Sequence, residues 1–247
     1  MTRRWHPWIA LLMLGVVLAA AIPSRALAGQ PGPVVSDLVR ETQKHSNVPG
    51  KLTMVWWLPE EFWSVSFQQS GSLTTEQQEA FLKTVRPYLL VAAVDGTIGP
   101  IGGSEFVDLE SLRARIKVTD KKGRSYSPLP DDQLTGDVKN LSALLRSMFG
   151  NMLGAMGQGL HLFFFPAATT DGSSIAAATK EGTFSVEVGE QSFTWRLPLA
   201  TLLSPKTCPV DGETMSGGWK YCPWHGKALE NEDKSKKKRR EPEPPGE

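Results

Sequence analysis

Residues 182–197, GTFSVEVGEQSFTWRL, hold the pattern that decides the fold class. Apolar and polar residues alternate on both sides of the central Gly-Glu pair, and Phe193, Trp195 and Leu197 share one face of the second half. A period of two predicts strands with one buried face, and the Gly-Glu pair between them predicts a tight turn. The stretch is therefore predicted to form a β-hairpin.

A second hairpin is predicted further toward the N-terminus. Apolar and polar residues alternate in Arg113–Thr119. Residues 121–123, Lys-Lys-Gly, are typical of a turn, and Arg124–Leu129 is expected to form the second strand, which pairs with the first. Two such hairpins indicate a sheet that is rich in antiparallel pairs.

Helical and strand-like segments surround the two hairpins. The expected helices are 34–45, 60–67, 75–88 and 137–156, and the other expected strands are 52–58, 89–94 and 160–165. The predicted fold class is therefore α+β: an antiparallel-rich sheet with packed helices, together with a small C-terminal module. We expect the aromatic residues between Trp56 and Phe67 to lie in the core. We expect the row Met148, Met152 and Met156 to fill a core-facing helix side rather than to bind Cu(I).

The first 28 residues have the three parts of a cleavable secretory signal peptide. Arg3 and Arg4 form a basic start, Trp8–Ile22 is apolar, and Ala26-Leu27-Ala28 is a small-residue cleavage site. The apolar run of about 15 residues is shorter than the ~20 that a membrane-spanning helix needs. We therefore expect cleavage before Gly29 and export to the periplasm or the exterior, with no transmembrane span in the mature chain. An uncleaved membrane anchor is the alternative.

The charge balance excludes some partner classes. The chain has 27 basic and 26 acidic residues, so it is nearly neutral. Nucleic-acid binding is not expected of such a chain. The oligomeric state is left open by the sequence.

A change of composition after Pro205 predicts a domain boundary. Residues 29–205 are expected to form the α+β domain, residues 206–229 a small module rich in Gly, Pro, Cys and Trp, and residues 230–247 a tail. The tail is charged and proline-rich without a large apolar residue, so it is expected to be disordered.

The small module contains two copies of one turn. These are residues 208–212, Cys-Pro-Val-Asp-Gly, and residues 222–226, Cys-Pro-Trp-His-Gly. Glycine ends each copy where the backbone needs a positive φ, so the first and fourth side chains of both turns can converge. The segment resembles the short two-knuckle zinc ribbon family, whose pattern is Cys-Pro-x-Cys-Gly, about ten residues, then an aromatic residue and Cys-x-x-Cys-Gly. Tyr221 stands at the place of the aromatic residue.

The resemblance implies a zinc site with an unusual set of ligands. Asp211 and His225 replace the second cysteine of each turn, so the implied ligands are Cys208, Asp211, Cys222 and His225. Two thiolates, one carboxylate and one imidazole can complete a tetrahedron around zinc, the only cofactor expected here. The alternative is a disulfide between Cys208 and Cys222, because an oxidising compartment favours pairing of two lone cysteines.

No catalytic motif is visible in the sequence. His45, His161 and His225 stand in unrelated contexts, and Gly-x-Ser-x-Gly, His-Glu-x-x-His and phosphate-loop patterns are absent. The leading hypothesis is an exported envelope protein that binds or scaffolds a protein or an envelope polymer without catalysis. The alternative is a secreted hydrolase whose catalytic residues are scattered along the chain.

Overall fold

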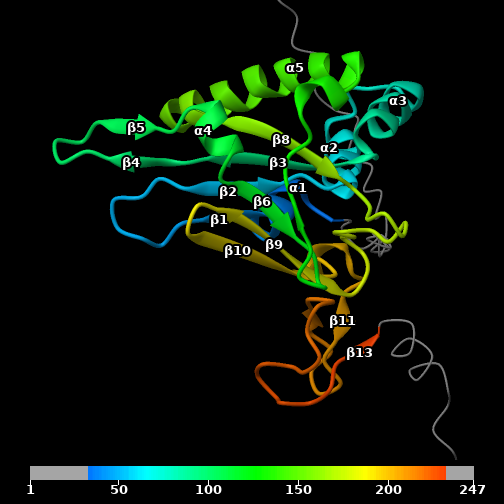
Figure 1. The fold of residues 1–247 in the computed structure, drawn as a ribbon. Helices are drawn as coiled ribbons and strands as arrows, with labels where there is room; N and C mark the ends of the chain where they lie inside the picture. The colour runs from blue at the N-terminus through cyan, green and yellow to red at the C-terminus, as the bar shows by residue number, and fades with distance from the viewer. Residues whose placement is uncertain (1–32, 232–247) are drawn as a thin grey trace, which may run out of the picture. The chain divides into compact units, whose positions relative to one another are not determined.

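In the computed structural model, which describes residues 33–231, two four-stranded antiparallel sheets form the body of the protein (Figure 1). The fold is α+β, as predicted. The expected signal peptide, residues 1–28, and most of the expected tail, residues 232–247, lie outside the described residues. No helix of the described part is long and apolar enough to cross a membrane.

The first sheet has the strand order β1–β2–β3–β8, and every neighbouring pair is antiparallel. Its strands are β1 (Gln43–His45), β2 (Met54–Trp57), β3 (Tyr88–Val94) and β8 (His161–Pro166). All four residues of β2 and the last six of β3 are buried. Both faces of these strands are therefore covered, which explains their nearly unbroken apolar sequences.

The second sheet joins the two predicted hairpins in the order β10–β9–β6–β7. Its strands are β6 (Ile116–Thr119), β7 (Ser125–Tyr126), β9 (Gly182–Val188) and β10 (Gln191–Leu197). Both hairpins are confirmed, and β6 pairs with β9 so that Val118 faces Val186. The alternating burial of β9 and β10 follows the alternating sequence.

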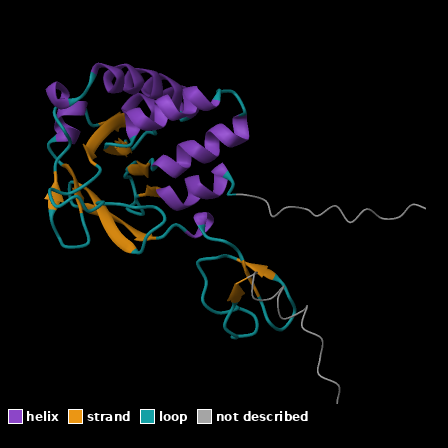
Figure 2. Cartoon of the chain, turned by 90° about the vertical axis from the view of Figure 1, so that its right-hand side faces the viewer, coloured by secondary structure: helices purple, strands orange, loops and turns teal. Residues whose placement is uncertain are grey.

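Four helices cover the face of the first sheet that points away from the second sheet (Figures 1 and 2). They are α1 (Val35–Thr42), α2 (Glu60–Ser70), α3 (Thr75–Val85) and α5 (Gly136–Met152). A capping box fixes the start of α3, because Thr74 accepts a hydrogen bond from the Gln77 backbone and the Gln77 side chain accepts one from the Thr74 backbone. The helices and the two sheets thus form three layers.

Two consecutive tryptophans of β2 point into the two spaces between these layers. Trp56 lies on the helical side, where its ring centroid is 5.0 Å from that of Phe149. Trp57 lies on the other side, 4.8 Å from the ring of Phe184 in the second sheet. Because side chains alternate along a strand, one dipeptide anchors both cores. The expectation that the aromatic residues of this region are buried is confirmed for Trp56, Trp57, Phe62 and Trp63.

Several elements differ from the sequence expectations. The first helix ends at Thr42, and residues 43–45, expected to be helical, form β1. The helix expected at 137–156 ends at Met152 and is followed by a 3-10 turn, Gly154–Gly159. The remaining elements were not predicted: the hairpin β4 (Gly96–Ile98) and β5 (Ser104–Phe106), the helix α4 (Leu109–Arg113), and the short 3-10 turns Asp131–Gln133 and Ala200–Leu202.

The expectation of a core-facing methionine row is wrong for two of its three members. Met148 is 48% exposed and Met152 is 60% exposed, whereas Met156 packs partly against the core. The side of α5 that faces the core is marked instead by Leu145 and Phe149, which lie four residues apart. Met148 and Met152 also lie four residues apart, but on a side of the helix that is turned away from the core.

The C-terminal module contains a three-stranded sheet in the order β12–β11–β13. Its strands are β11 (Lys206–Thr207), β12 (Thr214–Met215) and β13 (Glu230–Asn231). Because β13 pairs with β11, the first two residues of the expected tail belong to the module, and the boundary predicted at residue 229 is two residues early. The module has its own small core, formed by Cys208, Met215, Cys222 and Leu229.

Removing the Trp57 side chain should destabilise the body strongly. The residue is 2% exposed and contacts the second sheet, so Trp57→Ala should lower the free energy of unfolding by about 3–5 kcal/mol. The matched control is Met152→Ala, which changes an exposed side chain and should cost less than about 0.5 kcal/mol. Urea unfolding, followed by tryptophan fluorescence and circular dichroism, measures the free energy of unfolding of both variants. If the two substitutions lowered it by similar amounts, Trp57 would not have the central position in the core that the structure gives it.

A buried carboxylate holds the turn between β6 and β7. Asp120 accepts hydrogen bonds from the backbone N–H groups of Lys122 and Arg124, from the Arg124 guanidinium and from the Tyr126 hydroxyl. Burial alone would raise the pKa of Asp120, but these donors outweigh it and lower the pKa to about 2. The ionised form is therefore the one that stabilises the fold.

The contribution of Asp120 to stability should depend on pH in a defined direction. The pKa is lower in the folded chain than the value of about 3.9 expected after unfolding, so the stabilisation is complete above about pH 4 and is lost as the pH falls toward 2. Asp120→Asn should cost about 1–3 kcal/mol at pH 7, and the difference from the wild type should shrink below pH 4. Urea unfolding between pH 2 and pH 7 tests this, with the exposed Asp132→Asn as the control. A pH-independent difference would refute the assignment.

Candidate metal centre

The first knuckle, residues 208–213, is a tight turn closed by two backbone hydrogen bonds. The Gly212 N–H donates to the Cys208 carbonyl at 2.9 Å, and the Cys208 N–H donates to the Glu213 carbonyl, also at 2.9 Å. Gly212 has φ +75°, a left-handed conformation that favours glycine. Strands β11 and β12 flank the turn and pair with each other.

The second knuckle, residues 222–227, repeats this hydrogen-bond pattern. The Gly226 N–H donates to the Cys222 carbonyl at 2.9 Å, the Cys222 N–H donates to the Lys227 carbonyl at 2.8 Å, and Gly226 has φ +61°. A bridge between Tyr221 and Ala228 flanks the turn as β11 and β12 flank the first. The repetition predicted from the two Cys-Pro-x-x-Gly sequences is thus present in the backbone.

The structure brings Cys208, Cys222 and His225 together in one group, and Asp211, the fourth predicted ligand, lies beside His225 without belonging to that group. The Nδ1 atom of His225 lies 3.4 Å from the Cys208 sulfur, 3.5 Å from the Cys222 sulfur and 3.6 Å from the Asp211 Oδ2 atom. The two sulfurs and a nitrogen of His225 all lie within 4.8 Å of one another. Zinc bound at about 2.3 Å to sulfur and about 2.0–2.1 Å to nitrogen or oxygen would separate its tetrahedral ligand atoms by about 3.4–3.8 Å.

The ligand atoms differ in their burial. Both cysteines are 1% exposed, whereas the side chains of Asp211 and His225 are 38% and 34% exposed. The sulfurs therefore lie at the centre of the module, and the carboxylate and imidazole close the site from the solvent side. Both cysteines are free thiols in the structure. The disulfide remains the alternative state of this pair.

The local electrostatics distinguish the two thiols. Burial raises the pKa of Cys208. Burial would also raise the pKa of Cys222, but the backbone N–H groups of Trp224 and His225 and the His225 ring lower it overall. The pKa of Asp211 is lowered first by the Glu213 backbone N–H, and then by the Cys208 thiol and the His225 charge. The site thus stabilises one thiolate and one carboxylate, the forms that bind a cation.

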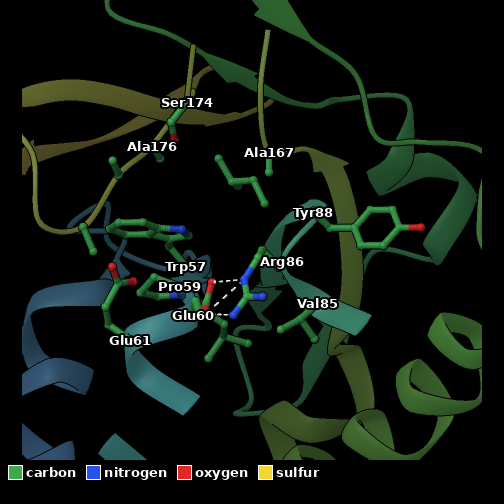
Figure 3. A pocket seen from close by; sticks show the side chains of 14 residues that line it. Trp57, Pro59, Glu60, Glu61, Val85, Arg86, Tyr88, Ala167, Ser174 and Ala176 are labelled. Atoms are coloured by element: carbon green, nitrogen blue, oxygen red, sulfur yellow. Dashed lines mark hydrogen bonds and ion pairs between the residues drawn. The ribbon is translucent and has the colours of Figure 1, made fainter. Parts of the chain in front are cut away.

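A cavity in the body is the strongest candidate for the alternative hydrolase function. It has a volume of about 250 Å³ and lies beside the start of α2, with Trp57, Glu60, Glu61 and Arg86 in its wall (Figure 3). Burial raises the pKa of Glu61, and the charge of Glu60 makes a smaller contribution in the same direction.

The second carboxylate of this cavity is already engaged. Both oxygens of Glu60 accept hydrogen bonds from Arg86 at 2.6–3.2 Å, so the pair joins α2 to the end of α3 (Figure 3). Among the described residues that line the cavity, Ser174 and Tyr88 carry hydroxyl groups, and no histidine accompanies them. His45 and His161 lie on β1 and β8, the two edge strands of the first sheet. No serine–histidine pair of the kind used in acyl transfer is thus present among the described residues that line this cavity.

Comparisons with protein-family models, curated proteins and solved structures gave no match. The group of Cys208, Cys222 and His225, with Asp211 beside His225, is therefore the basis for proposing a role for this chain.

Proposed function

We propose that the protein is an exported, non-enzymatic binding or scaffolding protein whose C-terminal module, residues 206–231, folds around one zinc ion. The ligands are Cys208, Asp211, Cys222 and His225. The observation that carries this proposal is the position of His225 Nδ1 within 3.6 Å of the two sulfurs and the carboxylate.

The size of the module supports a structural cross-link. Its core consists of two cysteines, Met215 and Leu229, which bury little apolar surface. Units below about 40 residues generally need a metal, a disulfide or oligomerisation to remain folded. A zinc ion would join the two knuckles, and the free energy of binding would become free energy of folding for the module.

The ligand set favours zinc in a structural role. Two thiolates and one imidazole match the preference of zinc for sulfur and nitrogen, while the tetrahedral arrangement needs the fourth ligand that Asp211 offers. Four protein ligands leave no open position for a water molecule or a substrate, so the site supports a scaffold rather than hydrolysis.

The purified protein should contain one zinc ion per chain. Metal quantification, native and denatured mass spectrometry and thiol counting on protein from the exported fraction measure this, and two reactive thiols should be found after denaturation. His225→Ala should lose the metal because three ligands remain, whereas the control His45→Ala, in β1, should keep it. A chain two protons lighter without metal would overturn the proposal in favour of the disulfide.

Exchanging the carboxylate for a third thiolate should strengthen metal binding. Zinc binds three cysteines and one histidine in common structural sites, so Asp211→Cys should raise zinc affinity at least tenfold in a chelator competition. Asp211→Asn should lower the affinity, because the amide has no charge to neutralise the cation. Co²⁺ titration reports the number of thiolate ligands in each variant. Equal affinities for all three proteins would show that Asp211 is not a ligand.

A further inference from the structure

A second cavity of the body has cations at its rim and apolar side chains at its floor. This cleft has a volume of about 310 Å³ and lies between α5, α4 and the edge strand β8. The lining residues that carry the argument are Arg113, Asp131, Lys139, Arg146, Leu162 and Phe164. We refer to it as the Arg113 cleft.

One wall of the Arg113 cleft is a stripe of α5. Lys139 and Arg146 are seven residues apart, with Ser142 between them, so the three side chains follow one another along the same side of the helix. Among the described residues, neither Lys139 nor Arg146 has an acidic group within ion-pair distance, although both line the cleft. Both cations are therefore available to an anionic ligand.

The opposite wall carries a third cation in a fixed position. The Arg113 guanidinium donates one hydrogen bond to the Leu129 carbonyl at 3.1 Å and another to the Asp131 carboxylate at 3.0 Å. These bonds use two of the five N–H donors of the side chain, so others are free for a ligand. Asp131 is the single acid in the lining, and it leaves the cleft with a surplus of positive charge.

The floor of the Arg113 cleft is apolar. Leu162 and Phe164 of β8 are 4% and 3% exposed, and the Leu129 N–H donates to the Phe164 carbonyl at 2.7 Å, which holds the side wall against the edge of the sheet. Small-molecule sites usually have volumes of about 300–1,000 Å³, and 310 Å³ is at the lower end of that range.

We infer that the Arg113 cleft binds a small amphipathic anion, with a carboxylate or phosphate head between Arg113, Lys139 and Arg146 and an apolar body against Leu162 and Phe164. The inference concerns the body of the protein and is independent of the zinc module. If no anion binds to the cleft, the proposed zinc module is not affected. If the module binds no zinc, the proposed anion site is not affected.

A ligand series with one chain length tests the inference. Decanoate and decyl phosphate carry the expected head groups, decanol is the neutral control, and decyltrimethylammonium is the cationic control. Decanoate or decyl phosphate should bind one per chain, at least tenfold more tightly than decanol, in calorimetric titrations at low salt. The amide signals of Ser142, Ala143 and Leu162 should shift in two-dimensional NMR spectra. Equal binding of all four compounds would overturn the inference, because it would show only apolar contact.

Two variants separate the cleft from the rest of the surface. Lys139→Gln combined with Arg146→Gln should weaken decanoate binding at least tenfold, whereas Lys83→Gln, an exposed lysine of α3 outside the cleft, should leave it unchanged. Phosphatidylglycerol vesicles distinguish a free ligand from a lipid head group held in a membrane. Shifts of the cleft signals with vesicles but not with decanoate would overturn the assignment to a free ligand, as would unchanged decanoate binding in the double variant.

Discussion

The body of the protein depends on the burial of β2 from both sides. Trp56 packs against Phe149 and Phe62 in the helical layer, and Trp57 packs against Phe184 and Trp195 in the second sheet. A strand that is covered on only one face would join two layers, whereas this strand joins three. The positions of α2, α5 and the β9–β10 hairpin relative to one another therefore follow from the side-chain alternation of one short strand.

The C-terminal module has a different source of stability. Its few buried side chains include both cysteines, so the atoms that form its core are also the atoms that would bind the metal. The two knuckles present their ligands through backbone turns with the same hydrogen bonds, and the flanking strands hold those turns in place. A cross-link at this point would stabilise the module as a whole, because the buried core that otherwise holds it together is small.

Charged groups have different roles at four sites of the described part of the molecule. In the Asp120 turn and in the Glu60–Arg86 pair, opposite charges meet and their hydrogen bonds are satisfied within the fold. Such groups hold the structure and have little capacity left for a ligand. In the Arg113 cleft, by contrast, Lys139 and Arg146 have no acidic partner among the described residues, and in the metal centre two free thiols lie beside one imidazole. These are the places where a ligand of opposite charge would complete the arrangement.

The sequence alone determined the elements whose patterns are local. The alternation in residues 182–197 predicted β9 and β10, and the repeated Cys-Pro-x-x-Gly turns predicted that Cys208, Cys222 and His225 would lie close together, because both patterns act within a few residues. Only the tertiary structure decided that residues 43–45 form an edge strand, since their partner is β2. It also decided that Met148 and Met152 are exposed and that Arg113 and Arg146 line one cleft. These features depend on contacts between segments far apart in the chain, for which a local pattern carries no signal.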